Sequence, residues 1–415
     1  MKIHFIGIGG IGVSALAQYY LAKGNEISGS DLVASEITDF LKNKGVKILI
    51  GPQTAKKLSD NIDLVVYSPA VKPENPELKF FREKGIKYIS YPEALGELTK
   101  EYFTIAVAGA HGKSTTTAIV GLILAKAGFD PTVVVGTKVK EFGNSNFRAG
   151  NSKYLVIEAC EYDSSFLHYF PKIIVVTNID KEHLDYFKTF ANVKKAFKDF
   201  IAKLPADGFL VFNRRPTMRQ KTAAKIKKIL KVPGDHNVFN ALDALEVARI
   251  LKIKDDITFK AFSEFTGTWR RFEIKEGRTY DKKITVISDY AHHPNEIIAT
   301  LKTTREKYPN KKIWCVFQPH QRQRTFYLFD DFVKVFRQAK INNIIITDIY
   351  DVAGRETRKI SADVSSEKLV KKINKKNVAY LPMDNLEKFI KKNIESGDVL
   401  IIMGAGDIYK LADKF

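Results

Sequence analysis

One stretch of the sequence constrains the fold more than any other: an apolar, β-branched run that leads through two glycines to Lys113 and Ser114. It reads Thr104-Ile-Ala-Val-Ala-Gly-Ala-His-Gly-Lys-Ser-Thr-Thr-Thr-Ala118, and apolar residues at helical spacing follow at once. A strand, a glycine-rich turn, Lys-Ser and a helix, in this order, are typical of a phosphate-binding loop. The full pattern also has a glycine five residues before Gly112, where this chain has Val107, so the loop is a shortened form.

The residue types of this loop suit phosphate chemistry. Small residues let backbone N–H groups approach phosphate oxygens, and the N-terminus of the following helix adds partial positive charge. Lys113 would reach the terminal phosphates of a nucleotide, and the Ser114 hydroxyl would ligate Mg²⁺. The alternative is a glycine turn with a solvated lysine, which would bind nothing.

Length and composition narrow the class of protein. A chain of 415 residues has room for about three domains, and 45% apolar with 27% charged residues is ordinary for a globular protein. No signal peptide follows Lys2, and no apolar run approaches the roughly 20 residues that span a bilayer. The two cysteines, Cys160 and Cys315, form neither a metal-binding spacing nor a disulfide framework. We therefore expect a cytoplasmic protein without membrane contact.

The formal charge of +20 raises the question of a nucleic-acid partner. The lysines are dispersed through short pieces such as 225–228 and 371–376, and no nucleic-acid-binding motif accompanies them. A positive field also suits small polyanionic substrates such as nucleotides. We expect no nucleic-acid partner.

The N-terminal region carries a second glycine-rich turn, Gly7-x-Gly9-x-x-Gly12, between a short strand and a helix. Asp31 follows nineteen residues after Gly12, at the end of the next predicted strand, 26–31. This is the dinucleotide fingerprint, with an acid placed for a ribose hydroxyl, and the same turn binds any nucleotide with a diphosphate. Alone it favours an NAD-dependent dehydrogenase, which would leave the phosphate loop idle. Further strands at 46–50, 64–67 and 87–90 predict a parallel sheet.

Acidic residues mark the carboxyl edge of the central sheet. Strands are predicted at 133–136, 154–158 and 172–178, with a glycine- and asparagine-rich loop at 142–146. Glu158 ends a buried strand and is our candidate Mg²⁺ ligand, with Glu161 and Asp163 as supporting acids. His183 follows the next strand and is a further metal candidate, although an isolated histidine is more often structural.

The end of the central region offers nucleotide-binding side chains. A helix is predicted from Phe190 and a strand at 208–213, and Asn237 stands near the start of a later helix, where it would read an adenine or simply cap the helix. Arg270 and Arg271 suit a phosphate clamp, or equally a salt bridge between domains.

The last region predicts another Rossmann-like sheet, with strands at 284–289, 313–317, 343–348 and 398–403. A polar loop follows each strand, including Asp289-Tyr-Ala-His-His-Pro294 and Gln318-Pro-His-Gln-Arg-Gln-Arg-Thr325. We predict an α/β protein of three domains: a Rossmann-like domain at 1–97, a central P-loop ATPase domain with a mostly parallel sheet at 98–271, and a Rossmann-like domain at 272–415.

Taken together, these pieces resemble the Mur ligases of bacterial cell-wall synthesis. The resemblance rests on segments spread over nearly the whole chain: 4–12, 27–31, the phosphate loop, 164–168, 236–240, 270–272, 289–294, 317–325 and 328–332. Each segment alone is weak evidence, whereas their order and spacing together are specific.

The resemblance implies an ATP-dependent carboxylate–amine ligase with Mg²⁺, whose substrates are UDP-N-acetylmuramate and L-alanine and whose product enters peptidoglycan. A related ligase that recycles whole peptides onto the same UDP-sugar is the enzymatic alternative. The resemblance leaves open whether the chain is a monomer or a homodimer. The catalytic residues that it implies are Lys113, Glu158, His183, His292 and Arg324, with Ser114, Glu158 and His183 at the metal.

The resemblance also implies three sets of binding residues. The ATP set is Gly109, Ala110, His111, Gly112, Lys113, Ser114, Thr115, Asn237, Asn240, Arg271 and Asp289. The UDP-sugar set is Gly9, Gly10, Ile11, Ser30, Asp31 and Ser68, and the amino-acid set is Tyr290, His292 and Arg324.

The sequence departs from the family pattern at a few positions. Cys160 replaces a common Asp, which removes a carboxylate near the expected metal, and Gln321 stands where many relatives have Arg. After Arg215 the connection to Pro233 is short, so we expect a trimmed central domain.

Overall fold

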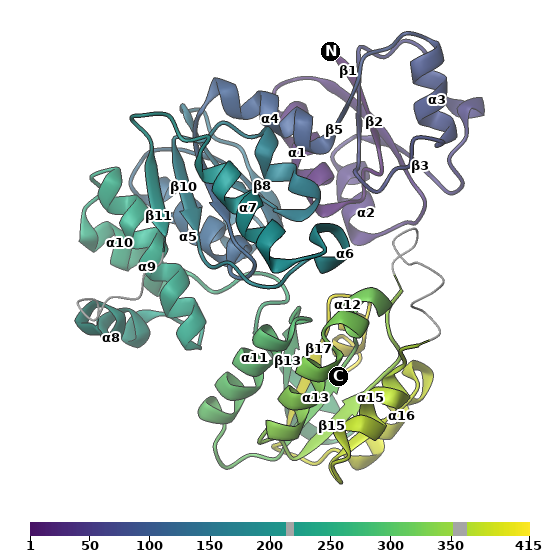
Figure 1. Cartoon of the computed structure of the whole chain (residues 1–415), viewed down its shortest axis with the longest axis vertical. Coiled ribbons are helices and arrows are strands. Elements are labelled where there is room, and N and C mark those ends of the chain that lie inside the picture. Colours follow the sequence, from purple (N-terminus) through teal and green to yellow (C-terminus); the bar gives the residue numbers. More distant parts are fainter. Residues whose placement is uncertain (213–219, 352–362) are drawn as a thin grey trace. The chain divides into compact units, whose positions relative to one another are not determined.

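The computed structural model describes residues 1–212, 220–351 and 363–415 (Figure 1). The stretch from Asn213 to Arg215, where the sequence predicts the start of a shortened connection, lies outside the described residues. The chain divides into two compact units, the first being Met1–Glu182, Phe190–Ile229 and Phe239–Thr266, and the second His183–Thr189, Leu230–Val238 and Gly267–Phe415. Within the described ranges no helix has both the length and the apolar character needed to cross a bilayer.

The first sheet is fully parallel, in the order β3-β2-β1-β4-β5. Its strands are β1 (Lys2–Ile6), β2 (Glu26–Asp31), β3 (Lys47–Ile50), β4 (Leu64–Tyr67) and β5 (Tyr88–Ser90). Its helices are α1 (Ile11–Ala22), α2 (Glu36–Asn43), η1 (Ala55–Lys57), α3 (Pro76–Glu83) and α4 (Tyr91–Glu101). The strand order reverses between β1 and β4, and ligands of such sheets bind outside the carboxyl ends at this switch point. The glycine turn after β1 and Ser68 after β4 therefore lie where a ligand is expected.

The second sheet has the order β11-β10-β6-β9-β7-β8 and is parallel apart from β8. Its strands are β6 (Phe103–Ala108), β7 (Thr132–Val139), β8 (Ser145–Arg148), β9 (Tyr154–Glu158), β10 (Ile173–Val176) and β11 (Phe209–Phe212). The helices are α5 (Lys113–Lys126), η2 (Lys140–Phe142), η3 (Tyr162–His168), α7 (Phe190–Ile201), α8 (Gln220–Ile229), α9 (Asp235–Ile250) and α10 (Asp255–Glu264). Helix α5 is apolar on nearly all sides from Ala118 to Ala125, and it is buried over most of its length.

The prediction of a loop at 142–146 is wrong at its end, because Ser145 begins strand β8. Only Gly143 and Asn144 form the turn, both with positive φ. Asn146 is buried in the strand because its amide finds partners on α1: it donates to Ile11 O and to Ser14 Oγ, the latter at 2.9 Å.

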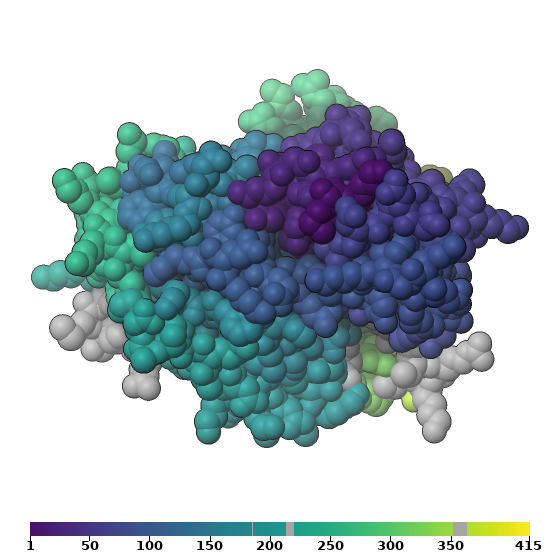
Figure 2. Space-filling view, turned by 90° about the horizontal axis from the view of Figure 1, so that it is seen from above, coloured from purple at the N-terminus to yellow at the C-terminus, as the bar shows by residue number. Residues whose placement is uncertain are grey.

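A buried polar seam thus joins the first two sheets within the first unit. Gln18 Nε2 donates to Asn146 Oδ1 at 2.8 Å, and Ser145 Oγ donates to Gln18 Oε1 at 3.1 Å. Figure 2 shows the surface passing without a break from the purple N-terminal residues to the blue and teal residues of the second sheet. The two glycine-rich turns therefore belong to one compact body.

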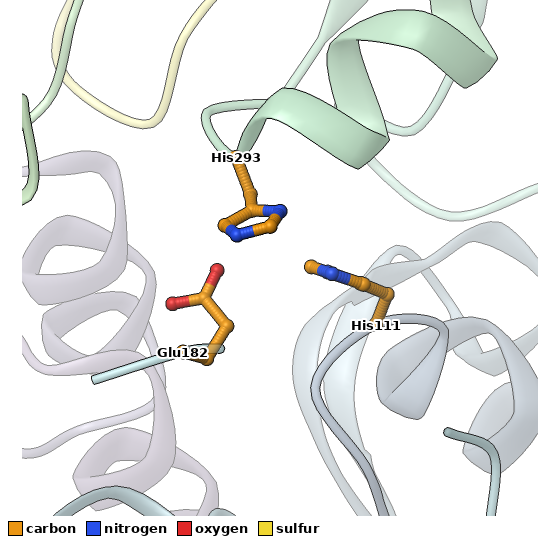
Figure 3. A group of neighbouring side chains, drawn as sticks. All are labelled: His111, Glu182 and His293. Carbon is orange, nitrogen blue, oxygen red and sulfur yellow. The ribbon is translucent and has the colours of Figure 1, made fainter. Parts of the chain in front are cut away.

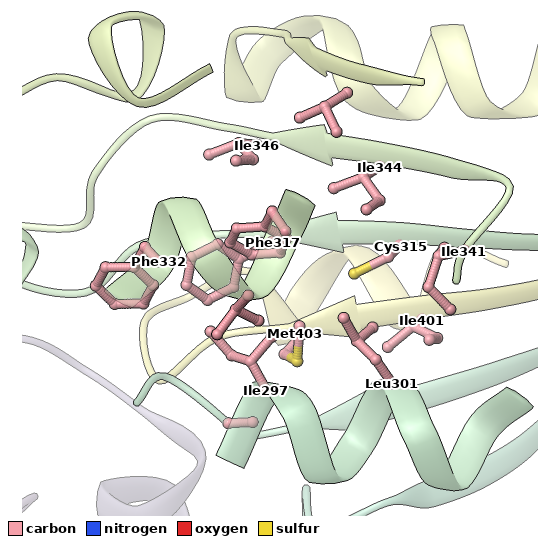
Figure 4. Close-up of a cluster of buried hydrophobic side chains, with 14 of the residues drawn as sticks. Ile297, Leu301, Cys315, Phe317, Phe332, Ile341, Ile344, Ile346, Ile401 and Met403 are labelled. Carbon is pink, nitrogen blue, oxygen red and sulfur yellow. The ribbon is translucent and has the colours of Figure 1, made fainter. Parts of the chain in front are cut away.

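The third sheet has the order β12-β13-β17-β14-β15-β16, and only the β12–β13 hairpin is antiparallel. The strands are β12 (Glu273–Thr279), β13 (Lys282–Asp289), β14 (Ile313–Phe317), β15 (Asn343–Ile346), β16 (Val378–Tyr380) and β17 (Val399–Met403). The helices of this unit are α6 (Leu184–Phe187), α11 (Pro294–Lys307), α12 (Arg322–Tyr327), α13 (Phe329–Gln338), α15 (Ser366–Ile373), α16 (Met383–Asn393) and α17 (Tyr409–Ala412). Figure 4 shows the core on one face of this sheet, a cluster that includes Phe317 and Ile344 of the strands and Ile297 of α11.

Candidate active site

The phosphate loop after β6 has the backbone that its sequence predicts. Gly109 has a φ of 140°, and Gly112, the N-cap of α5, has a φ of 85°. Residues other than glycine rarely adopt such backbone angles. Asn178, at the carboxyl end of β10, holds the loop: its Oδ1 accepts from His111 N at 3.0 Å and its Nδ2 donates to His111 O at 2.8 Å. Its carbonyl accepts from Ala110 N at 3.1 Å. Sequence reasoning placed Asn178 on a strand but missed this role.

Lys113 is the first residue of α5, and its ammonium group has partners on the loop and on Glu161. Lys113 Nζ donates to Ala110 O at 3.1 Å and to Gly109 O, and lies 3.0 Å from Glu161 Oε2. Burial lowers the pKa of Lys113, but Glu161, Cys160 and Glu158 together raise it by more, so the net shift is upward. The lysine is therefore held as a cation at the mouth of the loop.

Ser114 and Glu158 face each other as the metal prediction requires. Ser114 Oγ donates to Glu158 Oε2 at 2.8 Å, and Gly136 N donates to the same oxygen at 2.8 Å. Hydroxyl and carboxylate oxygens are the hard ligands that Mg²⁺ prefers, so the donor set fits this ion. Burial raises the pKa of the Cys160 thiol to about 12, with a further contribution from Glu161. Cys160 is thus a neutral thiol and does not supply the charge of the Asp that it replaces.

Histidine and acidic side chains also gather on the other side of the loop. His111 Nε2 lies 3.2 Å from Asp180 Oδ2, and His111 and Glu182 bring a ring nitrogen and a carboxylate oxygen within 4.8 Å of each other (Figure 3). His293, also drawn in Figure 3, belongs to the second unit, where its ring accepts from Asn295 N as the cap of α11. His183, the third predicted metal ligand, likewise falls in the second unit, with a φ of 54°.

The asparagines expected at the adenine lie on α9, three residues apart and thus on one face. Asn240 packs against the loop so closely that a Cβ at Gly112 would collide with its Oδ1. Asn237, in the first turn of α9, donates from Nδ2 to Pro233 O at 2.6 Å. Thr115 lies in the first turn of α5 and is buried.

The N-terminal glycine turn has the geometry of a diphosphate site. Gly7 has a φ of 78°, and Gly10 is the N-cap of α1, which begins at Ile11. Gly9 N donates to Asp31 Oδ2 at 2.8 Å, so the predicted ribose acid also fixes the turn. Ser68 lies beside it: a Cβ at Gly7 would be 2.9 Å from the Ser68 Cβ.

Ser30 contributes to this site through its backbone. Its carbonyl accepts from Gly7 N at 2.8 Å and from Ile8 N at 3.0 Å, whereas its hydroxyl donates to the buried Glu77. His4 Nε2 lies 3.8 Å from the same Glu77 carboxylate. The side chain of Ser30 is therefore part of a buried polar cluster.

The second unit carries the remaining predicted nucleotide residues. Burial raises the pKa of Asp289 to about 6, although hydrogen bonds from Ala291 N and Phe272 N oppose the shift. Arg271 Nη1 lies 3.6 Å from Glu296 Oε1. Arg270 is buried instead: it donates to Gly404 O at 2.6 Å and Gly406 O at 3.0 Å and lies over three aromatic rings, those of Trp269, Tyr290 and Tyr409. Arg270 is thus engaged within its own unit, and Arg271 remains as the candidate for clamping a phosphate.

The three predicted amino-acid-binding residues lie at the carboxyl edge of the third sheet. His320 connects them, because it lies between His292 and Arg324. The Tyr290 and His292 rings are 5.3 Å apart, and the His292 and His320 rings 5.9 Å. Arg324 Nη1 lies 3.0 Å from His320 Nδ1. Gln321, where relatives have Arg, is buried with a φ of 69°. Gln321 therefore acts through its backbone conformation, which forms the turn before α12.

Comparison with known proteins identifies the family. Models of the Mur ligase family match three successive stretches: its catalytic domain at 2–103, its middle domain at 107–232 and its glutamate ligase domain at 270–406. The chain belongs to the Mur ligase family. Mur ligases are ATP-dependent amide-bond ligases, and this chain has their three-domain α/β fold with mostly parallel sheets.

Among Mur ligases, the chain is similar to proteins of one name. A UDP-N-acetylmuramate–L-alanine ligase of Clostridium botulinum is 39% identical, over all of this chain and 97% of that protein. One of Caldanaerobacter subterraneus is 40% identical with the same coverage. The crystal structure of the UDP-N-acetylmuramate–alanine ligase of Thermotoga maritima is 28% identical and superposes with a TM-score of 0.81, over all of this chain and 98% of that one.

The relatives also bear on chain length. The Clostridium alignment runs over 453 positions, against 415 residues here, so that Mur ligase has residues without a counterpart in this chain. A murein peptide ligase of Psychrobacter arcticus, 23% identical over all of this chain and 98% of that one, has a TM-score of 0.73 and shares the fold.

Proposed function

We propose that this chain joins L-alanine to the lactoyl carboxylate of UDP-N-acetylmuramate, with cleavage of ATP to ADP and phosphate, in peptidoglycan synthesis. The observation that carries the proposal is that a turn suited to a nucleotide diphosphate and a phosphate loop suited to ATP belong to one compact unit. The similar proteins that bear this activity in their names support the choice of substrates.

The proposed reaction has two steps. An oxygen of the carboxylate attacks the γ-phosphorus of ATP, and the bond to the β,γ-bridging oxygen breaks with its electron pair going to ADP. The amine of L-alanine then attacks the acyl phosphate, and the tetrahedral intermediate collapses to the amide and phosphate, with loss of the amine proton. No covalent bond to the enzyme is needed, so the protein contributes position and charge.

Different side chains would balance charge, hold the metal ion and bind the amino acid. Lys113 would balance charge on the transferred phosphoryl group, and Ser114 with Glu158 would hold Mg²⁺, which when bound neutralises phosphate charge. His183 would complete the metal site. Arg324 would pair with the carboxylate of L-alanine, as guanidinium groups do.

The binding sets complete the proposal. The ATP set joins the loop residues 109–115 to Asn237, Asn240, Arg271 and Asp289, and the UDP-sugar set is the turn at Gly9–Ile11 with Ser30, Asp31 and Ser68. Tyr290 and His292 would hold L-alanine beside Arg324. The domains are proposed at 1–97, 98–271 and 272–415, and the reaction is placed in the cytoplasm, where ATP is supplied, in a monomer or homodimer.

A phosphate-release assay tests the function. ATP, Mg²⁺ and UDP-N-acetylmuramate are supplied with L-alanine, glycine, L-serine or a tripeptide, and kcat/KM is expected to be highest with L-alanine. Turnover with the tripeptide but none with L-alanine would show the recycling reaction instead. Binding of NADH is measured in parallel, and none is expected.

A further inference from the structure

Tyr91 is a residue that the sequence pattern did not single out. It is the first residue of α4, the helix that follows β5 and leads to β6 and the phosphate loop. A capping box fixes the start of this helix, because Ser90 N donates to Glu93 Oε2 at 2.7 Å and Glu93 N to Ser90 Oγ at 3.4 Å. Further along, a Cβ at Gly96 would lie 2.5 Å from the carbonyl oxygen of His168, so α4 is packed closely against η3. The position of Tyr91 is therefore set by the fold.

The phenol of Tyr91 lies beside the N-terminal glycine turn. A Cβ at Gly12 would lie 2.8 Å from both Tyr91 Oη and Tyr91 Cζ, so the end of this ring lies against the backbone of the turn. Burial raises the pKa of Tyr91, and the nearby Glu158 and Cys160 raise it further. The hydroxyl thus stays protonated, and it has no hydrogen-bond partner within residues 1–212, 220–351 and 363–415.

This position of Tyr91 fits the place where the carboxylate of a bound UDP-sugar would meet the γ-phosphate of ATP. The diphosphate of the UDP-sugar would lie on the turn that ends at Gly12, and the γ-phosphate of ATP near Lys113, Ser114 and Glu158. A neutral donor is well suited to such a place, because it binds a carboxylate without competing with it for cations. This role for Tyr91 rests on the proposed function, since it needs a nucleotide-sugar that carries a carboxylate.

We propose that Tyr91 donates a hydrogen bond to one carboxylate oxygen of the UDP-sugar and so orients the other oxygen for attack on the γ-phosphorus. The attacking oxygen forms its bond to phosphorus as the bond to the β,γ-bridging oxygen breaks, and ADP leaves with the electron pair. Tyr91 keeps its proton throughout.

The test compares Tyr91→Phe with the parent chain. Phenylalanine keeps the ring beside Gly12 and removes only the hydroxyl. Phosphate release is measured with UDP-N-acetylmuramate, ATP and L-alanine, and calorimetry gives the affinities for UDP-N-acetylmuramate and for UDP-N-acetylglucosamine, which lacks the lactoyl carboxylate. Tyr154→Phe, at the opposite end of β9 from Glu158, is the matched control and should behave as the parent chain.

A hydrogen bond to a charged group contributes enough for kcat in Tyr91→Phe to fall by about 10- to 100-fold. Affinity for UDP-N-acetylmuramate should fall as well, whereas that for UDP-N-acetylglucosamine should not change. Unchanged kcat, or equal losses of affinity for both sugars, would overturn the inference while leaving the proposed function in place. A parent chain that releases no phosphate from any of the offered acceptors would overturn the proposed function, and the inference with it.

Discussion

At the scale of single residues, the Lys113 side chain has two kinds of partner: the carbonyls of its own loop and the carboxylate of Glu161. Its ammonium group lies between loop carbonyls and the buried carboxylate of Glu161, which keeps the cation at the phosphate loop. A buried charge without a partner is costly, so each member of this pair needs the other. Glu161 therefore supports the loop by holding its lysine, a role that differs from metal binding.

Replacement of Lys113 by Ala should lower kcat for phosphate release by about 10²- to 10³-fold, the usual cost of losing one group that stabilises transition-state charge. Binding of the UDP-sugar should be unaffected, because its turn lies on the first sheet. Lys126→Ala, at the other end of α5, is the control and should retain full turnover. If Lys113→Ala turned over like the parent chain, the phosphate-loop assignment would be wrong.

Residues that act within one motif were predictable, and those that act from distant segments were not. Asp31 could be placed at the glycine turn because its distance from Gly12 is part of the fingerprint, and Gly9 N does bond to it. Asn178 and Tyr91 reach their positions only through the packing of separate strands and helices. For the same reason the pairing of Arg270 with the Gly404 carbonyl was invisible in the sequence.

At the scale of elements, the seam between α1 and β8 links the parts of the first unit that carry the two glycine-rich turns. Asn146→Ala would remove the buried hydrogen bonds that Asn146 makes with Gln18, Ile11 and Ser14, at a cost of about 2 kcal/mol in the free energy of unfolding. Because Ile11 opens the helix behind the diphosphate turn, affinity for the UDP-sugar should fall too.

Urea unfolding and calorimetry would measure both effects of Asn146→Ala. Asn61→Ala, in an exposed loop of the same unit, should change neither quantity. A normal UDP-sugar affinity in a destabilised Asn146→Ala would mean that the seam stabilises the unit without shaping the turn.

Most strands could be predicted from apolar runs, and two of those that were missed have a related cause. Strand β2 was predicted with its observed bounds, and α7 begins at Phe190 as expected. By contrast, β8 and β12 are rich in polar residues, because one is buried through side-chain hydrogen bonds and the other is a hairpin edge with exposed positions. Periodicity detects burial of apolar surface and misses strands that are formed by other interactions.

At the scale of the whole molecule, the charge of +20 should act on substrate encounter. UDP-N-acetylmuramate and ATP are polyanions, and a positive field raises their association rates at low salt. Raising NaCl from about 50 to about 500 mM shortens the Debye length several-fold and should lower kcat/KM for both nucleotides.

L-Alanine, which has no net charge, provides the internal control, because its KM should not respond to salt. Steady-state assays at constant pH measure these parameters. A kcat/KM for UDP-N-acetylmuramate that is independent of salt would show that the excess lysines have no part in steering.

The crowding around the two loop glycines also bears on antibacterial resistance. Gly109 and Gly112 combine positive φ with neighbours, Thr177 and Asn240, that occupy the space of any added side chain. Substitution at either codon would offer little escape from an inhibitor that contacts this backbone, since each change would distort the loop itself. Compounds anchored on glycine main chain should therefore meet escape variants elsewhere, at the exposed rim of the site, where substitutions cost the enzyme less.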